Sequence, residues 1–372
     1  MNKKILIATG IYPPEIGGSA TYVKNFCDIF IEKGFEICVI TYSDKKFYDE
    51  DKNLQYKLIR VARVSKFLNY IKYFIAIVKN IKKYDFIYST DIVSVGILCA
   101  IVKIIFRKKL ILRLGGDFQW ERALERNYNK SLGKYYKEKQ FTLKERLIYV
   151  FSNFVLRISD VIIFNSELLN SIYGESRDFM KRKNIVIIKN ILSAYKNTDK
   201  VDDKNILFAG RISKVKNIDK LIIAFDNLKL QNCKLKIIGD GPEFENIKKK
   251  IENHKNIELF RGVNYEQLIK EILKAKVVVN VSLTDINPNI ILEALVLGKK
   301  VIITNESEFL FTNSCHENIY YVDPNDIFDI EKALRLAISN EKLNTNCESI
   351  LKNVSCSKGE LIEKHFKIFE KL

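Results

Sequence analysis

The chain has 372 residues and a net charge of +17 at pH 7, with 47% hydrophobic and 29% charged residues. This length exceeds what one hydrophobic core usually holds, so it predicts two domains. The chain contains only 5 Pro and 15 Gly, and this low content excludes a collagen-like or low-complexity chain. The apolar run near the N-terminus is too short for a signal peptide, and the longest one, Ile92–Phe106, is too short to span a bilayer.

Cysteine and histidine are dispersed along the chain. Seven cysteines occur without a C-x-x-C pair, and the three histidines lie far apart in the sequence. This spacing predicts reduced thiols in a cytoplasmic protein, and it argues against a disulfide framework or a zinc site.

The charge is distributed unevenly. Residues 1–190 contain 34 Lys and Arg against 19 Asp and Glu, whereas residues 191–372 contain 28 against 26. A genome-wide bias toward lysine would load both halves equally. The asymmetry therefore favours an anionic partner for the first half of the chain.

Short apolar runs alternate with helical patterns in both halves. The strands that these runs predict are 4–9, 36–42, 58–64, 86–88, 109–114, 161–164 and 185–188, then 205–209, 234–238, 257–260, 277–281 and 300–303. A polar stretch between the two sets predicts a linker. The expected domains are 1–192, the linker 193–203, 204–355, and a C-terminal helix over 356–372 that packs back on the first domain.

This alternation of strand and helix predicts an α/β protein. Two sets of βαβ units give two Rossmann-like domains, each a doubly wound parallel sheet, which we expect to face each other across a cleft. Ligands of such sheets lie at the carboxyl ends of the strands. Residues that follow a strand are therefore the first candidates for a site.

The turn after the first strand contains two glycines at the start of a helix. Gly17 and Gly18 leave backbone N–H groups open to an anion, and the helix dipole adds to the attraction. A plain strand–helix turn is the alternative interpretation.

Corresponding turns in the second half carry charge. Gly210 and Arg211 follow a strand, and Lys216 lies where a helix begins. A guanidinium fork and a point charge at the mouth of a parallel sheet suit a diphosphate, although each residue taken alone fits a surface salt bridge. The Gly239–Gly241 turn, with Asp240 at its centre, also admits a ligand close to the backbone.

The stretch 282–302 contains two carboxylates in a strand–loop–helix context. Asp285 lies in the loop, Asn287 and Pro288 begin the helix, and Glu293 lies on an early turn of it. A carboxylate accepts two hydroxyls and so suits a sugar. A lone Asp or Glu is more often solvated surface, but this context favours a site.

Several motifs in this order resemble the GT-B-fold retaining glycosyltransferases of family 4 (glycosyl transferases group 1). The motifs are Tyr12-Pro-Pro…Gly17-Gly18, Ile188-Lys-Asn190, Gly210-Arg211…Lys216-Asn217, Gly239-Asp-Gly-Pro242, Phe260-Arg-Gly-Val263 and Pro288-Asn…Leu292-Glu-Ala-Leu…Gly298. The resemblance covers nearly the whole chain, and it implies a nucleotide-sugar donor bound mostly by the C-terminal domain. It also implies transfer with retention at the anomeric carbon.

The resemblance assigns a role to each matching position. Arg211 and Lys216 would stabilise the leaving diphosphate, Glu293 would bind the ribose, and Asp285 would hold hydroxyls of the donor sugar. The donor-binding set that it implies is Gly17, Gly18, Gly210, Arg211, Lys216, Gly239, Asp240, Gly241, Asn287, Asn289, Ile290 and Glu293. No metal or other cofactor is expected, because Lys, Arg and helix dipoles would neutralise the diphosphate.

Two positions depart from the family pattern. Asp285 replaces the first Glu of the usual Glu-x7-Glu pair, and the stretch 112–121 lacks the His-Gly of many members. Asp117 is the candidate acceptor-side group or base there. Trp120, beside Glu121, is a candidate stacking wall for an acceptor sugar. Helix capping by Asp117 and core packing of Trp120 are equally good alternatives.

The sequence thus predicts a glycosyltransferase of hexosyltransferase type that extends a surface polysaccharide such as O-antigen or capsule. The basic first domain would bind a glycan acceptor linked to polyprenyl diphosphate at the inner face of the cell membrane. No nucleic-acid partner is expected. The alternatives are a nucleotide-sugar epimerase of the same shape, a non-catalytic nucleotide-sugar binder and a basic nucleic-acid-binding protein.

Overall fold

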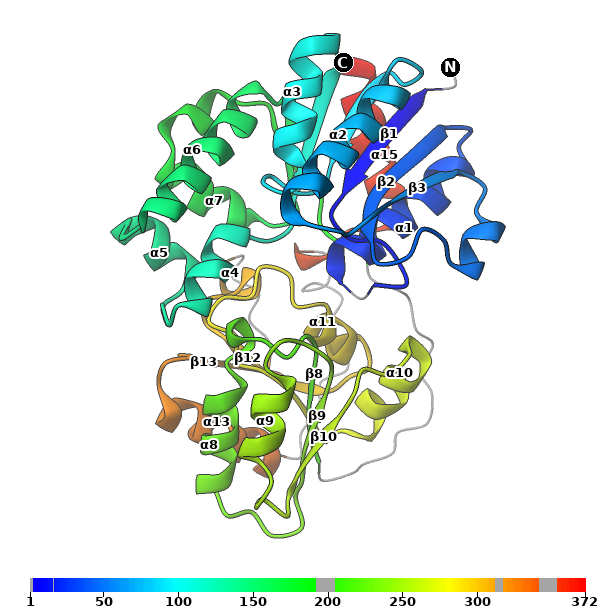
Figure 1. The fold of residues 1–372 in the computed structure, drawn as a ribbon. Helices are drawn as coiled ribbons and strands as arrows, with labels where there is room; N and C mark the ends of the chain where they lie inside the picture. The colour runs from blue at the N-terminus through cyan, green and yellow to red at the C-terminus, as the bar shows by residue number, and fades with distance from the viewer. Residues whose placement is uncertain (1–2, 16, 192–204, 312–316, 341–352) are drawn as a thin grey trace. The chain divides into compact units, whose positions relative to one another are not determined.

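The structure is a computed structural model that describes residues 3–15, 17–191, 205–311, 317–340 and 353–372. The chain divides into two compact units. Unit 1 comprises residues 1–119, 138–190 and 357–372, and unit 2 comprises residues 120–137 and 191–356. Figure 1 shows both units as strands with surrounding helices. The expected linker 193–203 lies outside the described residues.

Unit 1 contains a seven-stranded parallel sheet in the order β3-β2-β1-β4-β5-β6-β7. Its strands are β1 (Lys4–Thr9), β2 (Glu36–Ser43), β3 (Lys57–Ala62), β4 (Phe86–Ser89), β5 (Lys109–Leu114), β6 (Val161–Phe164) and β7 (Ile185–Ile187). The central strands are buried on both faces, which explains why the sequence reads as continuous apolar runs. The first predicted Rossmann-like sheet is confirmed.

The helices of unit 1 bury one apolar stripe each against this sheet. They are α1 (Gly18–Ile31), α2 (Lys66–Ile81), α3 (Gly96–Phe106), α6 (Leu143–Ile158), α7 (Glu167–Ser176) and α15 (Lys358–Lys371). In α1 the spacing of Val23, Phe26, Cys27 and Phe30 forms one stripe, and all four side chains lie in the core.

The C-terminal helix α15 is grouped with unit 1. Ser357 and Glu360 form a capping box at its start. Its His365 is fully buried, and its Nε2 lies 3.2 Å from the hydroxyls of both Tyr22 and Tyr88. Burial lowers the pKa of His365 to about 3, so the imidazole is neutral in the folded chain.

Unit 2 contains a six-stranded parallel sheet in the order β10-β9-β8-β11-β12-β13. Its strands are β8 (Ile206–Ala209), β9 (Leu235–Ile238), β10 (Ile257–Phe260), β11 (Val277–Asn280), β12 (Lys300–Thr304) and β13 (Ile319–Val322). The second Rossmann-like sheet is confirmed. It has one strand, β13, that the apolar runs did not single out.

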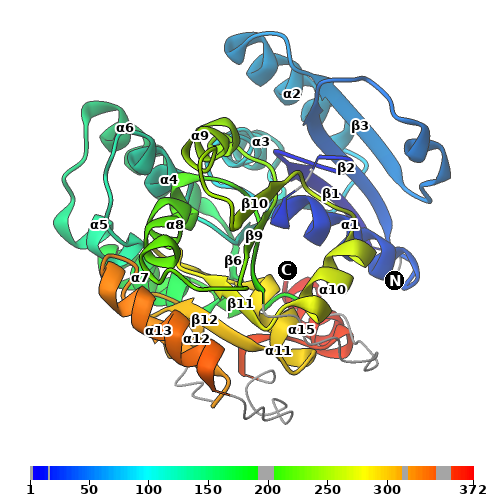
Figure 2. The same ribbon diagram turned by 90° about the horizontal axis from the view of Figure 1, so that it is seen from below.

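Helices lie on both faces of this second sheet. They are α8 (Ile218–Asn227), α9 (Phe244–Lys250), α10 (Tyr265–Lys274), α11 (Asn289–Val296), α12 (Glu308–Phe311) and α13 (Ile327–Ser339). Core residues of α8, α9 and α13 pack with one set of strand side chains, and those of α10 and α11 pack with the alternate set. Figure 2 shows the helices of this unit on the two sides of its strands.

An excursion of the chain, residues 120–137, belongs to unit 2 although its neighbours on both sides belong to unit 1. It holds most of α4 (Phe118–Glu125) and of α5 (Leu132–Glu138). The backbone N–H of Leu132 donates to the hydroxyl of Thr284 at 2.9 Å, and the Lys214 ammonium donates to the Glu125 carbonyl at 3.2 Å. The expected first domain, 1–192, therefore differs from unit 1 by this segment.

Candidate functional site

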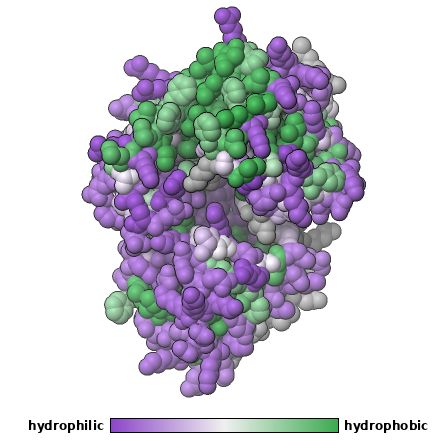
Figure 3. All heavy atoms as spheres, in the orientation of Figure 1, coloured by the Kyte–Doolittle hydropathy of each residue, from purple (hydrophilic) through white to green (hydrophobic). Residues whose placement is uncertain are grey.

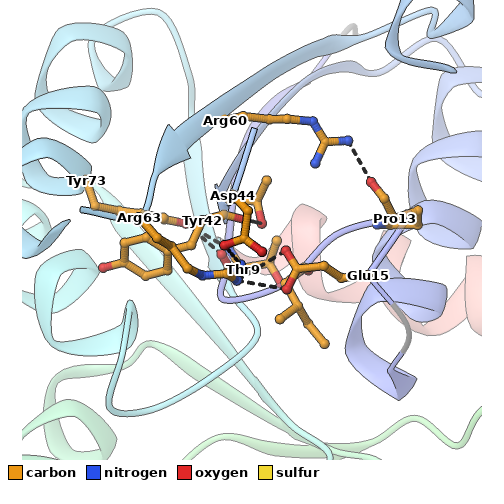
Figure 4. Close-up of polar contacts among 10 residues, drawn as sticks. Thr9, Pro13, Glu15, Tyr42, Asp44, Arg60, Arg63 and Tyr73 are labelled. Atoms are coloured by element: carbon orange, nitrogen blue, oxygen red, sulfur yellow. Dashed lines mark hydrogen bonds and ion pairs between the residues drawn. The ribbon is translucent and has the colours of Figure 1, made fainter. Parts of the chain in front are cut away.

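The β1–α1 loop of unit 1 is fixed by two arginines, one in strand β3 and one just after its end (Figure 4). The Arg60 guanidinium donates to the Pro13 carbonyl at 2.6 Å and forms a buried ion pair with Asp51. Arg63 donates to the Glu15 carboxylate at 2.8 Å. The loop that carries Gly17 and Gly18 is therefore tied to β3 on its N-terminal side.

Gly18 is the first residue of α1, and Gly17 is its N-cap. No side chain caps this helix, and its first turn has no acidic residue. A Cβ atom placed on Gly18 would meet nothing within 4 Å. The first N–H groups of α1 are thus available to an anion, as the sequence predicts for a glycine turn.

Two turns of unit 2 require glycine because the backbones of the loops after β8 and β9 approach each other closely. A Cβ atom on Gly239 would lie 1.8 Å from the Gly210 carbonyl oxygen, and one on Gly241 would lie 2.2 Å from the Ile212 carbonyl oxygen. Both glycines also have φ of +158°. The loops after β8 and β9 therefore pack backbone against backbone, and this contact alone explains the Gly-Asp-Gly motif.

Asp240, between these glycines, has partners within the protein. Its carboxylate accepts the Gly262 N–H at 2.8 Å and an Arg261 N–H at 3.1 Å. The Arg261 guanidinium also lies over the Phe244 ring, 3.6 Å from its centroid. In this structure the Asp240 side chain fixes the loop after β10, and a donor contact for it stays a prediction.

Arg211 and Lys216 lie in the loop that leads from β8 to α8. Lys216 ends a short 3₁₀ turn, Lys214–Lys216, rather than opening the helix, which begins at Ile218. The Arg211 side chain is 67% exposed, and its Nη1 lies 4.0 Å from Oε2 of Glu121. The guanidinium thus remains accessible to a further anion.

Asp285 is the buried anion of this region. Lys216 donates to Oδ2 of Asp285 at 2.8 Å, and Asn280 and Ser282 donate to the same oxygen. Asn280 ends β11, the strand next to β8 in the sheet. Two neighbouring strand ends therefore bring Lys216 and Asp285 together, as ligand sites of parallel sheets require.

The backbone also holds Asp285 in place. Its N–H donates to the Glu306 carbonyl at 2.9 Å, and its own carbonyl accepts the Glu308 N–H at 3.3 Å. These contacts come from the loop after β12, the strand on the other side of β11. The carboxylate is thus fixed by three adjacent strand ends.

Glu293 lies in the second turn of α11, as the sequence predicts. The Tyr265 hydroxyl donates to its Oε1 at 3.1 Å. Burial raises the pKa of Glu293 to about 7, well above the usual value for a glutamate. The carboxyl is consequently divided between its two protonation states at neutral pH.

The start of α11 carries the remaining predicted donor-side residues. Pro288 is the N-cap, and Asn289 and Ile290 form the first turn. Oδ1 of Asn287 is buried and has no hydrogen-bond partner. A buried acceptor of this kind is satisfied when a ligand supplies a hydroxyl or an N–H.

The acceptor-side candidates fall in different units. Asp117, in unit 1, is buried and accepts the Tyr173 hydroxyl at 2.7 Å. Trp120 and Glu121 are grouped with unit 2, whereas the expected first domain, 1–192, contains all three. Trp120 is 2% exposed and donates to the Lys130 carbonyl at 3.0 Å. This burial favours core packing over a stacking wall.

Four polar residues of these regions were not singled out by the sequence. Asn280 and Ser282 bind Asp285, and Tyr265 binds Glu293. In unit 1, Arg113 at the end of β5 is buried, and its guanidinium lies 3.4 Å from the centroid of the Tyr22 ring. Asn280 and Arg113 are polar residues at the ends of apolar runs. That position in the sequence could have identified both as candidate site residues.

Metal-binding side chains do not gather in the described part of the chain. Within it, no group of three His, Cys, Asp or Glu side chains is placed to hold a metal ion. The Lys216 ammonium is the cation that faces Asp285. The expectation that no metal takes part stays a prediction.

Comparisons with known proteins support the two-sheet fold described above. Residues 192–353 match the model of the family described as glycosyl transferases group 1. No curated protein matches the sequence. Sucrose-phosphate synthase from Thermosynechococcus elongatus matches at a TM-score of 0.74 and 14% identity, covering 100% of this chain and 99% of that one.

Two further solved structures have the same fold. Anabaena HepE in complex with UDP and glucose matches at a TM-score of 0.72 and 15% identity over 100% of both chains. The lipopolysaccharide outer core galactosyltransferase WaaB matches at a TM-score of 0.65 and 16% identity, covering 99% of this chain and 100% of that one.

The two parallel sheets define the GT-B fold of glycosyltransferases. Within the C-terminal half, residues 192–353 are similar to the glycosyl transferases group 1 family.

Proposed function

We propose that the chain is a retaining glycosyltransferase that moves a sugar from a nucleotide-sugar donor to a glycan acceptor. One observation carries this proposal. Buried Asp285 is paired with Lys216, and exposed Arg211 lies in the same loop as Lys216, where two neighbouring parallel strands end. Cations and a fixed carboxylate at this place match the two needs of the reaction, which are a stabilised diphosphate and an oriented sugar.

The two cations have complementary roles in this proposal. Arg211 binds the diphosphate through its planar fork, and Lys216 bridges between the diphosphate and Asp285. As the bond from the anomeric carbon to the diphosphate breaks, negative charge builds on the leaving oxygen. Fixed positive charges stabilise that oxygen without reorganising, which lowers the barrier of the transfer step.

The carboxylates orient the donor. Asp285 accepts hydroxyls of the donor sugar, and its three donors at Oδ2 hold it in one orientation. Glu293 accepts hydroxyls of the ribose and must be ionised to accept two of them. Retention at the anomeric carbon rests on the motif resemblance, and so does the hexosyl nature of the transferred group.

The donor is a nucleoside-diphosphate sugar. Structures with the same fold contain UDP and UDP-glucose in Anabaena HepE, and UDP in Staphylococcus aureus TarM. In unit 2, Arg211 and Lys216 are the anion-binding elements. The uncapped start of α1 is a separate anion-binding element of unit 1. No metal is assigned a role in holding the diphosphate.

The acceptor is a glycan, and we assign it a lipid carrier such as polyprenyl diphosphate. The basic first half of the sequence supports an anionic acceptor, and the fold is shared with the lipopolysaccharide galactosyltransferase WaaB. The reaction would then take place at the inner face of the cell membrane, in surface polysaccharide synthesis. Of the described helices, none is long and apolar enough to cross a membrane.

Thermal stability of the full chain against a panel of nucleotide sugars and bare nucleotides tests the proposal. A donor present at 100 times its dissociation constant adds roughly 2.7 kcal/mol to the free energy of unfolding. We expect a rise in Tm with one nucleotide sugar that is lost in Arg211→Ala. A chain that no member of the panel stabilises at millimolar concentration would contradict the donor site.

A further inference from the structure

Helix α2 of unit 1 has a second apolar side that faces solvent. Phe67 is 74% exposed, and Leu68, Ile71 and Ile75 are exposed on the same side. Positions 67, 71 and 75 are four residues apart, so they form one stripe along the helix. The opposite stripe, which contains Ile77, is buried against the sheet. The exposed stripe therefore does not contribute to the core.

The neighbouring helices extend this apolar stripe. Helix α3 packs against both α2 and α6. It exposes Ile101, Ile104 and Ile105, and α6 exposes Leu147 and Phe151 among others. In Figure 3, apolar residues gather over the region that Figure 1 labels α2 and α3. We call this surface the α2–α3–α6 face.

The charge of the same helices has one sign. Lys72 and Lys79 of α2 and Lys144 and Arg146 of α6 are exposed. The only acidic residue in the sequences of the three helices is Glu145, which is buried and caps α6. A partner of this face must accept apolar side chains and also supply negative charge.

We propose that the α2–α3–α6 face docks on an anionic lipid bilayer. Helices with exposed apolar side chains beside lysines lie in the boundary between headgroups and acyl chains, where each side chain meets its preferred medium. A second copy of this chain would bring the same positive charges together, which disfavours a dimer through this face. The proposal rests on the proposed function for its purpose, which is to bring the enzyme to a lipid-linked acceptor.

Vesicle binding by the full chain tests the docking. We expect the protein to co-sediment with phosphatidylcholine vesicles that contain phosphatidylglycerol, and far less with phosphatidylcholine alone. The double variant Lys72→Gln/Lys79→Gln should lower the partition coefficient roughly 30-fold, since each basic residue near an anionic surface contributes about 1 kcal/mol. Phe67→Ser should lower it about tenfold, because a ring no longer enters the apolar boundary.

Unit 2 supplies matched controls for both variants. Phe328 on α13 is 79% exposed, so Phe328→Ser removes an equally exposed ring from the other unit. Lys248→Gln/Lys249→Gln removes two exposed lysines of α9. Both control variants should bind vesicles as the unaltered chain does. All four variants replace exposed side chains, and an unchanged Tm verifies that each one folds.

Three results would overturn the docking surface. These are no binding to anionic vesicles, equal loss in the control and test variants, or a dimer in light scattering that Phe67→Ser dissociates. Donor binding is measured on the same variants and is expected to be unchanged. A chain that binds vesicles but no nucleotide sugar would refute the proposed function and leave the α2–α3–α6 face in place.

Discussion

The helices of the two units differ in how they meet solvent. In unit 1, α2, α3 and α6 expose apolar stripes and carry basic residues without exposed acidic ones. In unit 2, basic and acidic residues of the helices pair, as in Lys270 with Glu266 and Lys250 with Asp219. Exposed rings such as Phe328 occur singly there. One Rossmann-like architecture thus carries a surface suited to a partner in one unit and an ordinary solvated surface in the other.

The units also differ in how they hold charge in their interiors. Unit 2 contains the salt bridge between Lys216 and Asp285, and exposed Arg211 lies in the same loop as Lys216. Unit 1 buries a neutral group, His365, between two tyrosine hydroxyls. A charge kept in the interior costs desolvation energy, which is retained where chemistry needs the charge. This contrast supports our proposal that the reaction takes place at the strand ends of unit 2.

Removing the half-buried Lys216 of unit 2 should have the largest effect. We expect Lys216→Ala to lower kcat/KM for sugar transfer roughly 100- to 1000-fold, because a fixed charge that faces the leaving diphosphate is lost. Lys274→Ala, which removes an exposed lysine of α10, should leave the rate within about twofold. Equal rates for both variants in a transfer assay would place the reaction elsewhere.

The second largest effect is expected when alanine replaces a glycine in a turn, because the change in stability should differ between the two units. Gly239→Ala brings a methyl group against the Gly210 carbonyl, and we expect it to lower the free energy of unfolding by about 2 to 4 kcal/mol. Gly18→Ala meets no neighbour and replaces a helix glycine, so it should raise stability by up to about 1 kcal/mol. Denaturant unfolding of both variants checks this, and a stable Gly239→Ala would show that the turn is not tightly packed.

The pH dependence of stability should include opposite contributions from the two units. The pKa of His365 falls from 6.5 to about 3 on folding, so only the unfolded chain takes up this proton between those values. His365 therefore makes the folded state less stable as pH falls below 6.5. His365→Gln should remove this loss in unfolding curves measured at pH 5 and pH 7. An unchanged difference between the two pH values would refute a neutral buried imidazole.

Glu293 should act in the other direction. Its pKa rises from 4.5 to about 7 on folding, so the folded state keeps a proton that the unfolded chain releases. Stability then falls as pH rises from 4.5 to 7, by up to about 3 kcal/mol, and Glu293→Gln should remove this fall. If the ribose needs the ionised carboxylate, donor affinity should also be up to about tenfold weaker at pH 6 than at pH 8. Calorimetric titration at the two pH values measures this.

Much of the fold was predictable because its strands are buried on both faces. The strands β1, β5 and β6, in which every side chain after the first is buried, have the bounds that their apolar runs predict. The edge strand β10 also has its predicted bounds, although only Ile257 of it is buried. The spacing of Asp285 and Glu293 likewise indicated a loop and the helix after it, and both lie there.

The missed features depend on contacts between distant residues. Nothing in the sequence shows that residues 120–137 pack with unit 2, because the contacts that hold them there join distant segments. Leu132 bonds Thr284, and Glu125 bonds Lys214. Asp240 matches a donor-binding motif, yet its carboxylate holds Arg261. Tyr265 lies 28 residues before Glu293 in the sequence, and folding alone brings its hydroxyl to the carboxylate.

The most direct test of the proposed donor site is the affinity of the full chain for a nucleotide sugar, measured by calorimetry with and without Arg211→Ala. We expect one nucleotide sugar to bind, and the variant to weaken its binding at least about tenfold, or roughly 1.4 kcal/mol. Lys72→Gln/Lys79→Gln should leave this affinity unchanged. A donor that binds Arg211→Ala as tightly as the unaltered chain would contradict the assignment of the reaction to the strand ends of unit 2.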